Sequence, residues 1–267
     1  MSVFEAVILG IVQGLTEFLP ISSSGHLVLL RKIFGISEPA MFFDTMVHVG
    51  TLLAVFVVLW RDIWAILRRP LQRLTGLLIV ATVPAVIAAL LLGETIEQAF
   101  ETGRFLGFSF LATTALLIIA ELLSRRARSG DGLKKAEDMS WLDALVIGIL
   151  QAIAISPGLS RSGATISGAL SRKLDRDFAA RFSFLLSIPA ILGAVVLQVK
   201  DLSGAADGGI PAAAVVAGSL SAAVVGFFAV RFMLKIIREK SLFGFAIYTA
   251  VLGTLILVDK FGTHLVF

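Results

Sequence analysis

Long runs of apolar residues, separated by short charged stretches, dominate the chain. Spanning the hydrocarbon core of a bilayer takes about 20 mostly apolar residues in a helix. The runs are unbroken rather than alternating, which favours helices over a β-barrel. The pattern therefore predicts six spanning helices, at residues 42–60, 74–92, 105–123, 179–199, 211–230 and 243–259.

Two further apolar segments, residues 3–19 and 141–155, are too polar or too short to span the bilayer. Each ends near a proline and is followed by a Ser/Gly cluster and a second short helical stretch, at residues 24–34 and 162–172. A short helix, a polar break and a second short helix are typical of a re-entrant hairpin. Such irregular backbone is tolerated at membrane depth only where protein or a polar cavity receives its free N–H and C=O groups.

The two predicted hairpins are related to each other. A shift of 138 residues aligns residues 10–25 (GIVQGLTEFLPISSSG) with residues 148–163 (GILQAIAISPGLSRSG), and six of the sixteen positions are identical. We therefore predict one membrane domain made of two repeats, 1–130 and 139–267, each with a hairpin and three spanning helices. Because three is odd, the second repeat enters the membrane upside down. This is the inverted-repeat plan, in which the hairpins meet near the midplane and form the functional site.

Charge sets the expected orientation. Of the 23 Lys and Arg residues, seventeen fall on one side of the predicted membrane and five on the other, with Arg161 in a hairpin break. The basic side is cytoplasmic by the positive-inside rule. Both termini are then expected at the outer face of a plasma membrane. The first hairpin is expected to open to that outer face, and the second hairpin to the cytoplasm.

Composition narrows the class further. The chain is 57% hydrophobic, with a mean hydropathy of +0.95, which indicates an integral membrane protein. The net charge of +4 follows from the loop asymmetry, so we expect no nucleic-acid partner. There is no Cys, which removes disulfides and thiolate chemistry, and the N-terminus lacks the features of a cleaved signal peptide.

Few ionisable residues fall at membrane depth, where each is a candidate for function. Glu17, His26 and Arg161 lie inside the predicted hydrocarbon layer. Asp44 and His48 lie four residues apart near the outer end of a spanning helix. For these two, a supporting role at an entrance and an ordinary interfacial role are equally consistent with the sequence.

The polar breaks predict an anion site. Each begins a short helix, and a helix start leaves unpaired N–H groups and a partial positive charge. Two starts converging from opposite leaflets favour an anion, and Arg161 adds a fork of donors suited to phosphate oxygens. The alternative is that the serines only cap helices and that Arg161 only pairs with Glu17. The candidate substrate-binding residues in the breaks are Ser22, Ser24, Gly25, Ser160, Ser162 and Gly163.

The reactive groups are concentrated in the first hairpin. Glu17 can act as a base or, with Gln13 one turn earlier, share a divalent cation; the alternative for Gln13 is helix–helix hydrogen bonding. His26 carries an imidazole, which exchanges protons near neutral pH. The second repeat has Ile155 and Ala164 at the positions of Glu17 and His26. This division of labour favours catalysis over simple binding.

Three motifs carry a resemblance to a known family. Residues 13–17 (QGLTE) fit its [E/Q]-x-x-x-E motif, residues 157–165 (PGLSRSGAT) fit its P-G-x-S-R-S-x-x-T motif, and residues 22–26 (SSSGH) supply its histidine. The chain resembles, over its whole length, the undecaprenyl-diphosphate phosphatases of the bacitracin-resistance type. The second motif is specific, whereas the first alone would be weak.

The resemblance implies a hydrolase that removes the terminal phosphate of undecaprenyl diphosphate at the outer face of the bacterial inner membrane. The monophosphate is then recycled for peptidoglycan synthesis, and overproduction confers bacitracin resistance. A divalent cation, Mg²⁺ or Ca²⁺, is expected. The first motif begins with Gln rather than Glu, so it does not supply a two-carboxylate metal site. The implied catalytic residues are Glu17, Ser23, His26 and Arg161, with Glu17 and Gln13 at the metal and Gly158 and Thr165 beside the substrate.

Several alternatives stay open at this point. A transporter or flippase of an anionic prenyl-phosphate lipid would share the inverted repeats and Arg161, but it has less need of Glu17, Ser23 and His26 in one repeat. A purely structural membrane protein does not explain the buried charges. The sequence leaves open whether Ser23 or water is the nucleophile, and whether the protein is a homodimer.

Overall fold

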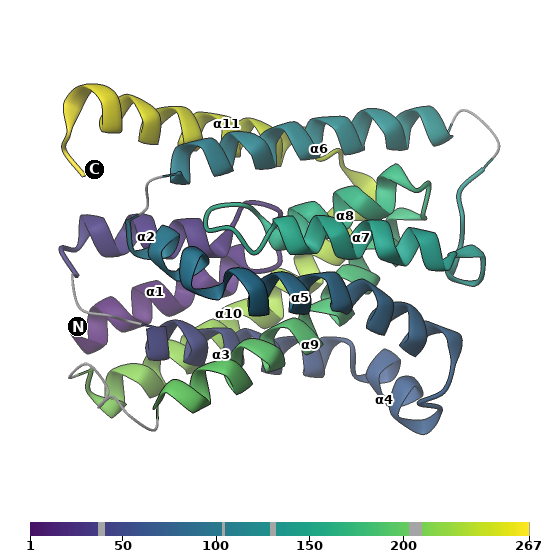
Figure 1. The fold of residues 1–267 in the computed structure, drawn as a ribbon, viewed down its shortest axis with the longest axis horizontal. Coiled ribbons are helices and arrows are strands. Elements are labelled where there is room, and N and C mark those ends of the chain that lie inside the picture. The colour runs from purple at the N-terminus through teal and green to yellow at the C-terminus, as the bar shows by residue number, and fades with distance from the viewer. Residues whose placement is uncertain (37–40, 103–104, 129–131, 203–209, 267) are drawn as a thin grey trace.

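A computed structural model describes residues 1–36, 41–102, 105–128, 132–202 and 210–266, and this part of the chain is helical almost throughout. The helices lie roughly along one direction, and both termini are at the same end (Figure 1). The α-helices are α1 (Val3–Thr16), α2 (Ser23–Ile33), α3 (Met41–Val58), α4 (Trp60–Arg68), α5 (Arg73–Thr102), α6 (Leu106–Arg128), α7 (Trp141–Ile153), α8 (Arg161–Ser171), α9 (Arg176–Leu202), α10 (Ala212–Glu239) and α11 (Phe243–Val258).

The predicted spanning segments are confirmed as helices. Among the described residues, five helices are long and apolar enough to cross a membrane, namely α5, α6, α9, α10 and α11, and α3 with α4 makes a sixth if the bent pair is one span. The 80° bend between α3 and α4 was not predicted. It follows Leu59, where the apolar run gives way to Arg61 and Asp62. The rings of Trp60 and Trp64 stack at 5.3 Å on α4 and are exposed, as expected of an aromatic belt at an interface.

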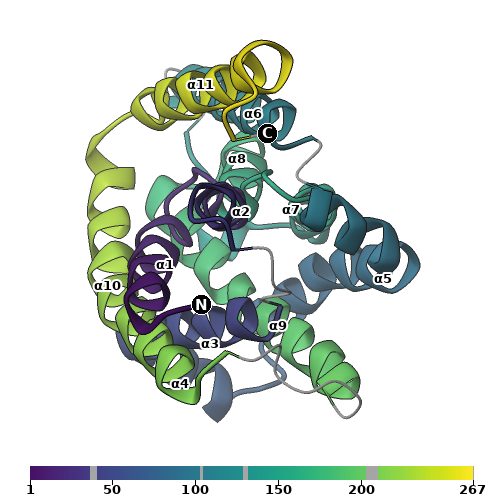
Figure 2. The ribbon, with the colours of Figure 1, turned by 90° about the vertical axis from the view of Figure 1, so that its left-hand side faces the viewer.

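The two expected pairs of short helices are present, as α1 with α2 and α7 with α8. The first helix of each pair starts with the same capping box, Ser2 with Glu5 in α1 and Ser140 with Asp143 in α7. Viewed along the helices, α2 and α8 lie at the centre, surrounded by the longer helices (Figure 2). The breaks that precede α2 and α8 are therefore enclosed by protein, as irregular backbone at membrane depth requires.

Small residues allow close packing of the outer helices against α1 and α7. A Cβ on Gly10 of α1 would lie 2.1 Å from the Gly218 carbonyl oxygen of α10. A Cβ on Gly148 of α7 would lie 2.6 Å from the Ala81 carbonyl oxygen of α5. Gly10 and Gly148 are partners in the 138-residue shift, so α1 meets α10 as α7 meets α5. This packing agrees with two related repeats, while their upside-down relation stays a prediction.

Candidate active site

The break between α1 and α2 meets the break between α7 and α8. The Ser162 hydroxyl donates to the Leu19 carbonyl oxygen at 2.9 Å. The Gly158 N–H donates to the Ser24 hydroxyl at 3.4 Å. These bonds join segments far apart in the sequence, so the predicted convergence of the two polar clusters is found in the structure.

Glu17 is the centre of this meeting point, and its side chain is 4% exposed. Its Oε2 accepts hydrogen bonds from Gln13 Nε2 at 2.9 Å and from the Ser23 hydroxyl at 2.5 Å. Its Oε1 accepts from Arg161 Nη2 across the two breaks. One carboxylate therefore links a candidate nucleophile, a candidate metal ligand and the cationic group of the other repeat.

The serines also cap the helices, as the simpler interpretation of the sequence expected. Ser22 Oγ accepts from the Gly25 N–H, and Ser160 Oγ accepts from the Gly163 N–H. Capping leaves the N–H groups of Ser23 and Ser24 without a hydrogen-bond partner among the described residues. Capping and anion binding are thus compatible, because the caps occupy N–H groups deeper in each first turn.

Arg161 pairs with Glu17, as the simpler interpretation of the sequence, with helix caps and one ion pair, also expected. Its side chain is 19% exposed, so it is not sealed inside the protein. Within the described chain, its only hydrogen bond from the guanidinium goes to Glu17. The other guanidinium N–H groups are therefore available to an anion.

The backbone of both breaks is unusual. Ser22 has a φ of +71° and Gly158 has a φ of +83°. Such conformations are costly for a residue with a side chain and cluster at functional sites. A Cβ on Gly158 would also lie 2.7 Å from Leu106 Cδ1, so glycine is needed there both for its backbone and for space.

Other predicted site residues support the second break. Thr165 Oγ1 lies 2.6 Å from the Ser183 hydroxyl of α9, and both side chains are buried. The Ser160 N–H donates to Thr113 Oγ1 of α6 at 3.0 Å. These bonds fix α8 to its neighbours, and the place of Thr165 beside the substrate stays a prediction.

His26 lies in the same helix as Ser23 but belongs to a different contact group. Its Nδ1 is 2.6 Å from the Ser22 carbonyl oxygen, and its Nε2 is 2.7 Å from the Tyr248 hydroxyl of α11. In the described part of the chain, no hydrogen bond joins His26 to Glu17. The imidazole that faces Glu17 is instead His48, whose Nε2 lies 3.5 Å from Oε2.

His48 and Asp44 extend the polar network along α3. His48 Nδ1 lies 2.6 Å from the Asp44 carbonyl oxygen, and Asp44 pairs with Arg31 of α2 at 2.7 Å. Of the two roles the sequence left open for these residues, the contact with Glu17 favours a supporting one for His48.

The donor set fits a divalent cation only if other oxygens complete it. Gln13 Oε1 is buried without a hydrogen-bond partner, next to the Glu17 carboxylate. Among the described residues there is no group of three His, Cys, Asp or Glu side chains able to hold a metal. Mg²⁺ prefers oxygen ligands and is commonly held by one or two carboxylates together with substrate phosphates and water. Glu17 and Gln13 suit that kind of site.

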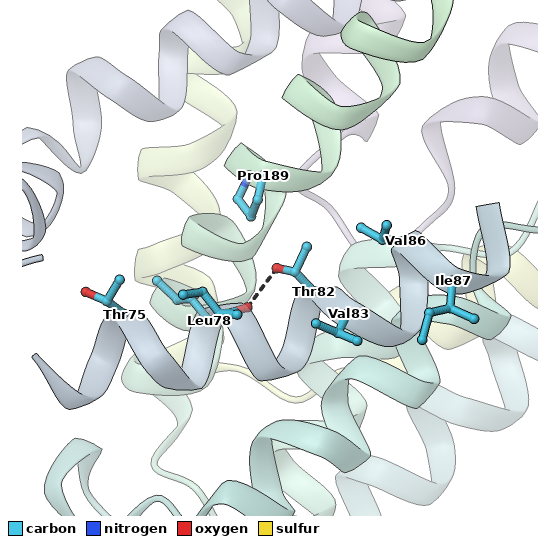
Figure 3. A pocket seen from close by; sticks show the side chains of 8 residues that line it. Thr75, Leu78, Thr82, Val83, Val86, Ile87 and Pro189 are labelled. Carbon is cyan, nitrogen blue, oxygen red and sulfur yellow. Dashed lines mark hydrogen bonds between the residues drawn. The ribbon is translucent and has the colours of Figure 1, made fainter. Parts of the chain in front are cut away.

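Two apolar grooves flank the helices away from these polar residues. The first, of about 360 Å³, lies between α5 and α9, where Thr82, Val86 and Pro189 face it (Figure 3). The second, also about 360 Å³, lies between α3 and α10 and is lined by residues such as Leu53 and Phe227. Neither is lined by a titratable group, so we expect lipid chains rather than chemistry at both.

Sequence reasoning missed some of these contacts. Tyr248 lies in an apolar spanning helix and gives no sequence signal beyond being the single tyrosine of the chain. Glu121 and Arg176 form a second buried ion pair, at 2.8 Å, with both side chains 4% exposed. Arg176 also donates to the Ile237 and Lys240 carbonyl oxygens at the end of α10. This pair fixes helix ends and lies outside the network of Glu17.

Together, these features define an all-helical, multi-span membrane protein with a buried polar site where two broken helical pairs meet.

Residues 6–255 match the family model described as bacitracin resistance protein BacA. A protein of Carboxydothermus hydrogenoformans named undecaprenyl-diphosphatase is 47% identical over 97% of both chains. Undecaprenyl-diphosphatase 3 of Bacillus cereus is 46% identical over 98% of both chains. An undecaprenyl-diphosphatase of Methanosphaera stadtmanae is 39% identical over 97% of this chain and 98% of its own. The chain belongs to the BacA bacitracin-resistance family.

Proposed function

We propose that this protein hydrolyses undecaprenyl diphosphate to undecaprenyl phosphate and inorganic phosphate, which recycles a carrier lipid for cell-wall synthesis and confers bacitracin resistance. The names of its relatives and the family match support this activity. The observation that carries it is the network in which Glu17 accepts hydrogen bonds from Ser23 and Arg161. A nucleophile, its base and a phosphate-binding cation are thereby joined in one buried site.

The chain's own residues account for substrate binding. Arg161 and the free N–H groups at the start of α2 bind the phosphate oxygens, where they neutralise charge in a water-poor site. The prenyl tail lies between helices, in contact with lipid. Glu17 and Gln13 would hold a divalent cation, which supplies further neutralisation of phosphate charge when bound.

Proton transfer accompanies attack on the terminal phosphorus. The Ser23 oxygen forms the new P–O bond while the Ser23 proton passes to Glu17 Oε2, which already accepts that hydrogen bond. The bond from phosphorus to the bridging oxygen breaks, and His26 supplies a proton to the leaving phosphate. Water then attacks the phosphorus of the phosphoserine, the bond from phosphorus to the Ser23 oxygen breaks, and Glu17 returns its proton to that oxygen. The proton of the attacking water leaves with the inorganic phosphate.

The test is phosphate release from undecaprenyl diphosphate by the purified protein, with Mg²⁺ or Ca²⁺ added and with the ions removed by a chelator. We expect release only in the presence of the ion. A wild-type protein that releases no phosphate with either ion, but moves the labelled lipid between leaflets of a vesicle, would establish the transporter alternative instead.

We further propose that the protein lies in the bacterial inner membrane with both termini and the opening of the site at the outer face. The asymmetry of Lys and Arg supports this orientation, and the termini share one end of the molecule (Figure 1). The chain has no Cys, so single cysteines can report it. A membrane-impermeant maleimide should label Gly262→Cys in intact cells, and it should label Leu71→Cys only after permeabilisation. The reverse pattern would overturn the orientation.

A further inference from the structure

Both ring nitrogens of His26 are engaged in hydrogen bonds. Nδ1 lies 2.6 Å from the Ser22 carbonyl oxygen, which only accepts, so Nδ1 carries a proton. In the neutral imidazole Nε2 is then the acceptor, and the Tyr248 hydroxyl, 2.7 Å away, donates to it. The one basic nitrogen of His26 therefore faces Tyr248 and not the Glu17 network.

Among the described residues, the His26 side chain makes no hydrogen bond other than those to Ser22 and Tyr248. The Phe110 ring meets the imidazole edge-on at 5.4 Å, and the Tyr248 ring lies parallel to it at 5.7 Å. His26 is 8% exposed, whereas Tyr248 is 44% exposed. The Tyr248 hydroxyl thus connects an enclosed imidazole with the partly open flank of α11.

Tyr248 is held in place by its neighbour in the helix. Thr249 Oγ1 lies 2.8 Å from Thr114 Oγ1 of α6, which fixes α11 against the helix that also carries Phe110. The contact between Tyr248 and His26 is therefore a supported feature of the packing, because a second interhelical hydrogen bond lies directly beside it.

We propose that Tyr248 is the proton relay of His26. The inference rests on the proposed hydrolase function, in which His26 supplies a proton to the leaving phosphate. In that step the phenol donates its proton to the bridging oxygen of the leaving phosphate while it takes one from protonated Nε2, so Tyr248 ends unchanged and His26 ends neutral. To reset the site, water at the exposed flank of α11 gives a proton to the phenol oxygen while the phenol passes its own proton to Nε2. The Nδ1–H bond to Ser22 is kept throughout and holds the ring in this orientation.

The single tyrosine allows a direct test. Fluorinated tyrosines incorporated in place of tyrosine change only Tyr248, and they alter the acidity of its hydroxyl with little change in size. We expect kcat for phosphate release to change progressively with the acidity of the phenol, and KM to stay within about twofold. Tyr248→Phe should lower kcat by about 10- to 100-fold, a range below or near that of a full acid–base group. In a His26→Ala background, neither change should have a further effect.

Ile247→Val is the matched control, because it changes an exposed neighbouring side chain of α11 and leaves the hydrogen bonds of Tyr248 and Thr249 in place, and it should retain the wild-type rate. A second readout does not depend on activity. The chain has three His, so the ¹⁵N signals of His26 can be assigned. Nδ1–H should dominate in the wild type and in Tyr248→Phe, because Ser22 holds that proton, whereas the Nε2 signal should shift in Tyr248→Phe, which loses the hydrogen bond to Nε2.

The outcomes separate the two claims. If the wild-type protein is active but fluorination and Tyr248→Phe leave kcat unchanged, the relay is overturned and the hydrolase function stands. An Nε2–H tautomer of His26 in the wild type would overturn the relay as well. If the wild type releases no phosphate, the proposed function fails and the relay fails with it.

Discussion

Glu17 and Arg161, 144 residues apart in the sequence, form an ion pair across the two helix breaks. Each belongs to a different predicted repeat, so neither half contains the complete site. A buried charge left without its partner is strongly unfavourable. The pair therefore stabilises the junction at rest, while the remaining guanidinium N–H groups are free to bind a phosphate.

Ser23 should prove to be the nucleophile. Its hydroxyl is 2.5 Å from Glu17 Oε2, the geometry of a nucleophile with its base. We expect Ser23→Ala to lower kcat by at least about 10³-fold, because loss of an activated nucleophile costs up to about 10⁶-fold in other hydrolases. Ser221→Ala is the control, because in the described part of the chain that hydroxyl bonds only within its own helix, to Ala217.

A rapid-quench experiment with substrate labelled on the terminal phosphate gives the direct readout for Ser23. Label should appear on Ser23 before free phosphate accumulates. A Ser23→Ala protein with the wild-type rate, and no labelled wild-type protein at any time, would establish water as the nucleophile.

Gln13 and its repeat partner Gln151 should respond differently to metal. Among the described residues, the carbonyl oxygens of both side chains lack a hydrogen-bond partner, but Gln13 donates to the Glu17 carboxylate whereas Gln151 donates to the Ala81 carbonyl oxygen of α5. Gln13→Ala should raise the Mg²⁺ concentration needed for half-maximal activity by about tenfold or more. Gln151→Ala should leave that concentration unchanged. Equal Mg²⁺ requirements in both variants and the wild type would place the cation elsewhere.

The sequence predicted the helices and the meeting of the breaks for clear physical reasons. Apolar length determines which segments span a bilayer, and the Ser/Gly clusters mark where the short helices are interrupted. The contact of Tyr248 with His26 was not predictable, because a tyrosine in an apolar helix gives no sign of which residue its hydroxyl meets. Likewise, Glu121 falls near the end of a spanning segment, where charged residues are common. Its burial with Arg176 was not predictable, because it depends on how several helices meet.

The buried pair of Glu121 and Arg176 should matter for stability rather than activity. Arg176→Ala leaves the Glu121 carboxylate buried without this partner, and the expected loss of unfolding free energy is about 3–5 kcal/mol. Arg125 also pairs with Glu121, but its side chain is 55% exposed. Arg125→Ala should therefore cost less than about 1 kcal/mol.

Titration of the detergent-solubilised variants with a denaturant measures these losses in stability. Equal midpoints for Arg176→Ala and Arg125→Ala would contradict the assignment of Arg176 as the buried partner.

Close helix packing predicts which glycines tolerate a methyl group. Gly10→Ala forces α1 away from the Gly218 carbonyl of α10 and should destabilise the protein by about 1–3 kcal/mol. A methyl group on Gly93 of α5 would meet no described atom within 4 Å, so Gly93→Ala should be neutral or stabilise the helix. The measurement is the temperature at which each variant loses its monodisperse peak in size-exclusion chromatography. A Gly10→Ala protein as heat-resistant as the wild type would contradict the packing of α1 on α10.

In the mechanism that we propose, Arg161 and Glu17 bring the two halves together as one phosphate-hydrolysing site. The most direct measurement is the rate of phosphate release from undecaprenyl diphosphate by Arg161→Ala, compared with Arg172→Ala at the other end of the same helix, where the side chain pairs with Asp143. We expect a loss of about 10²–10³-fold for Arg161→Ala, the usual cost of removing one charge-stabilising group, and near wild-type release for Arg172→Ala. Wild-type release by a folded Arg161→Ala protein would contradict it.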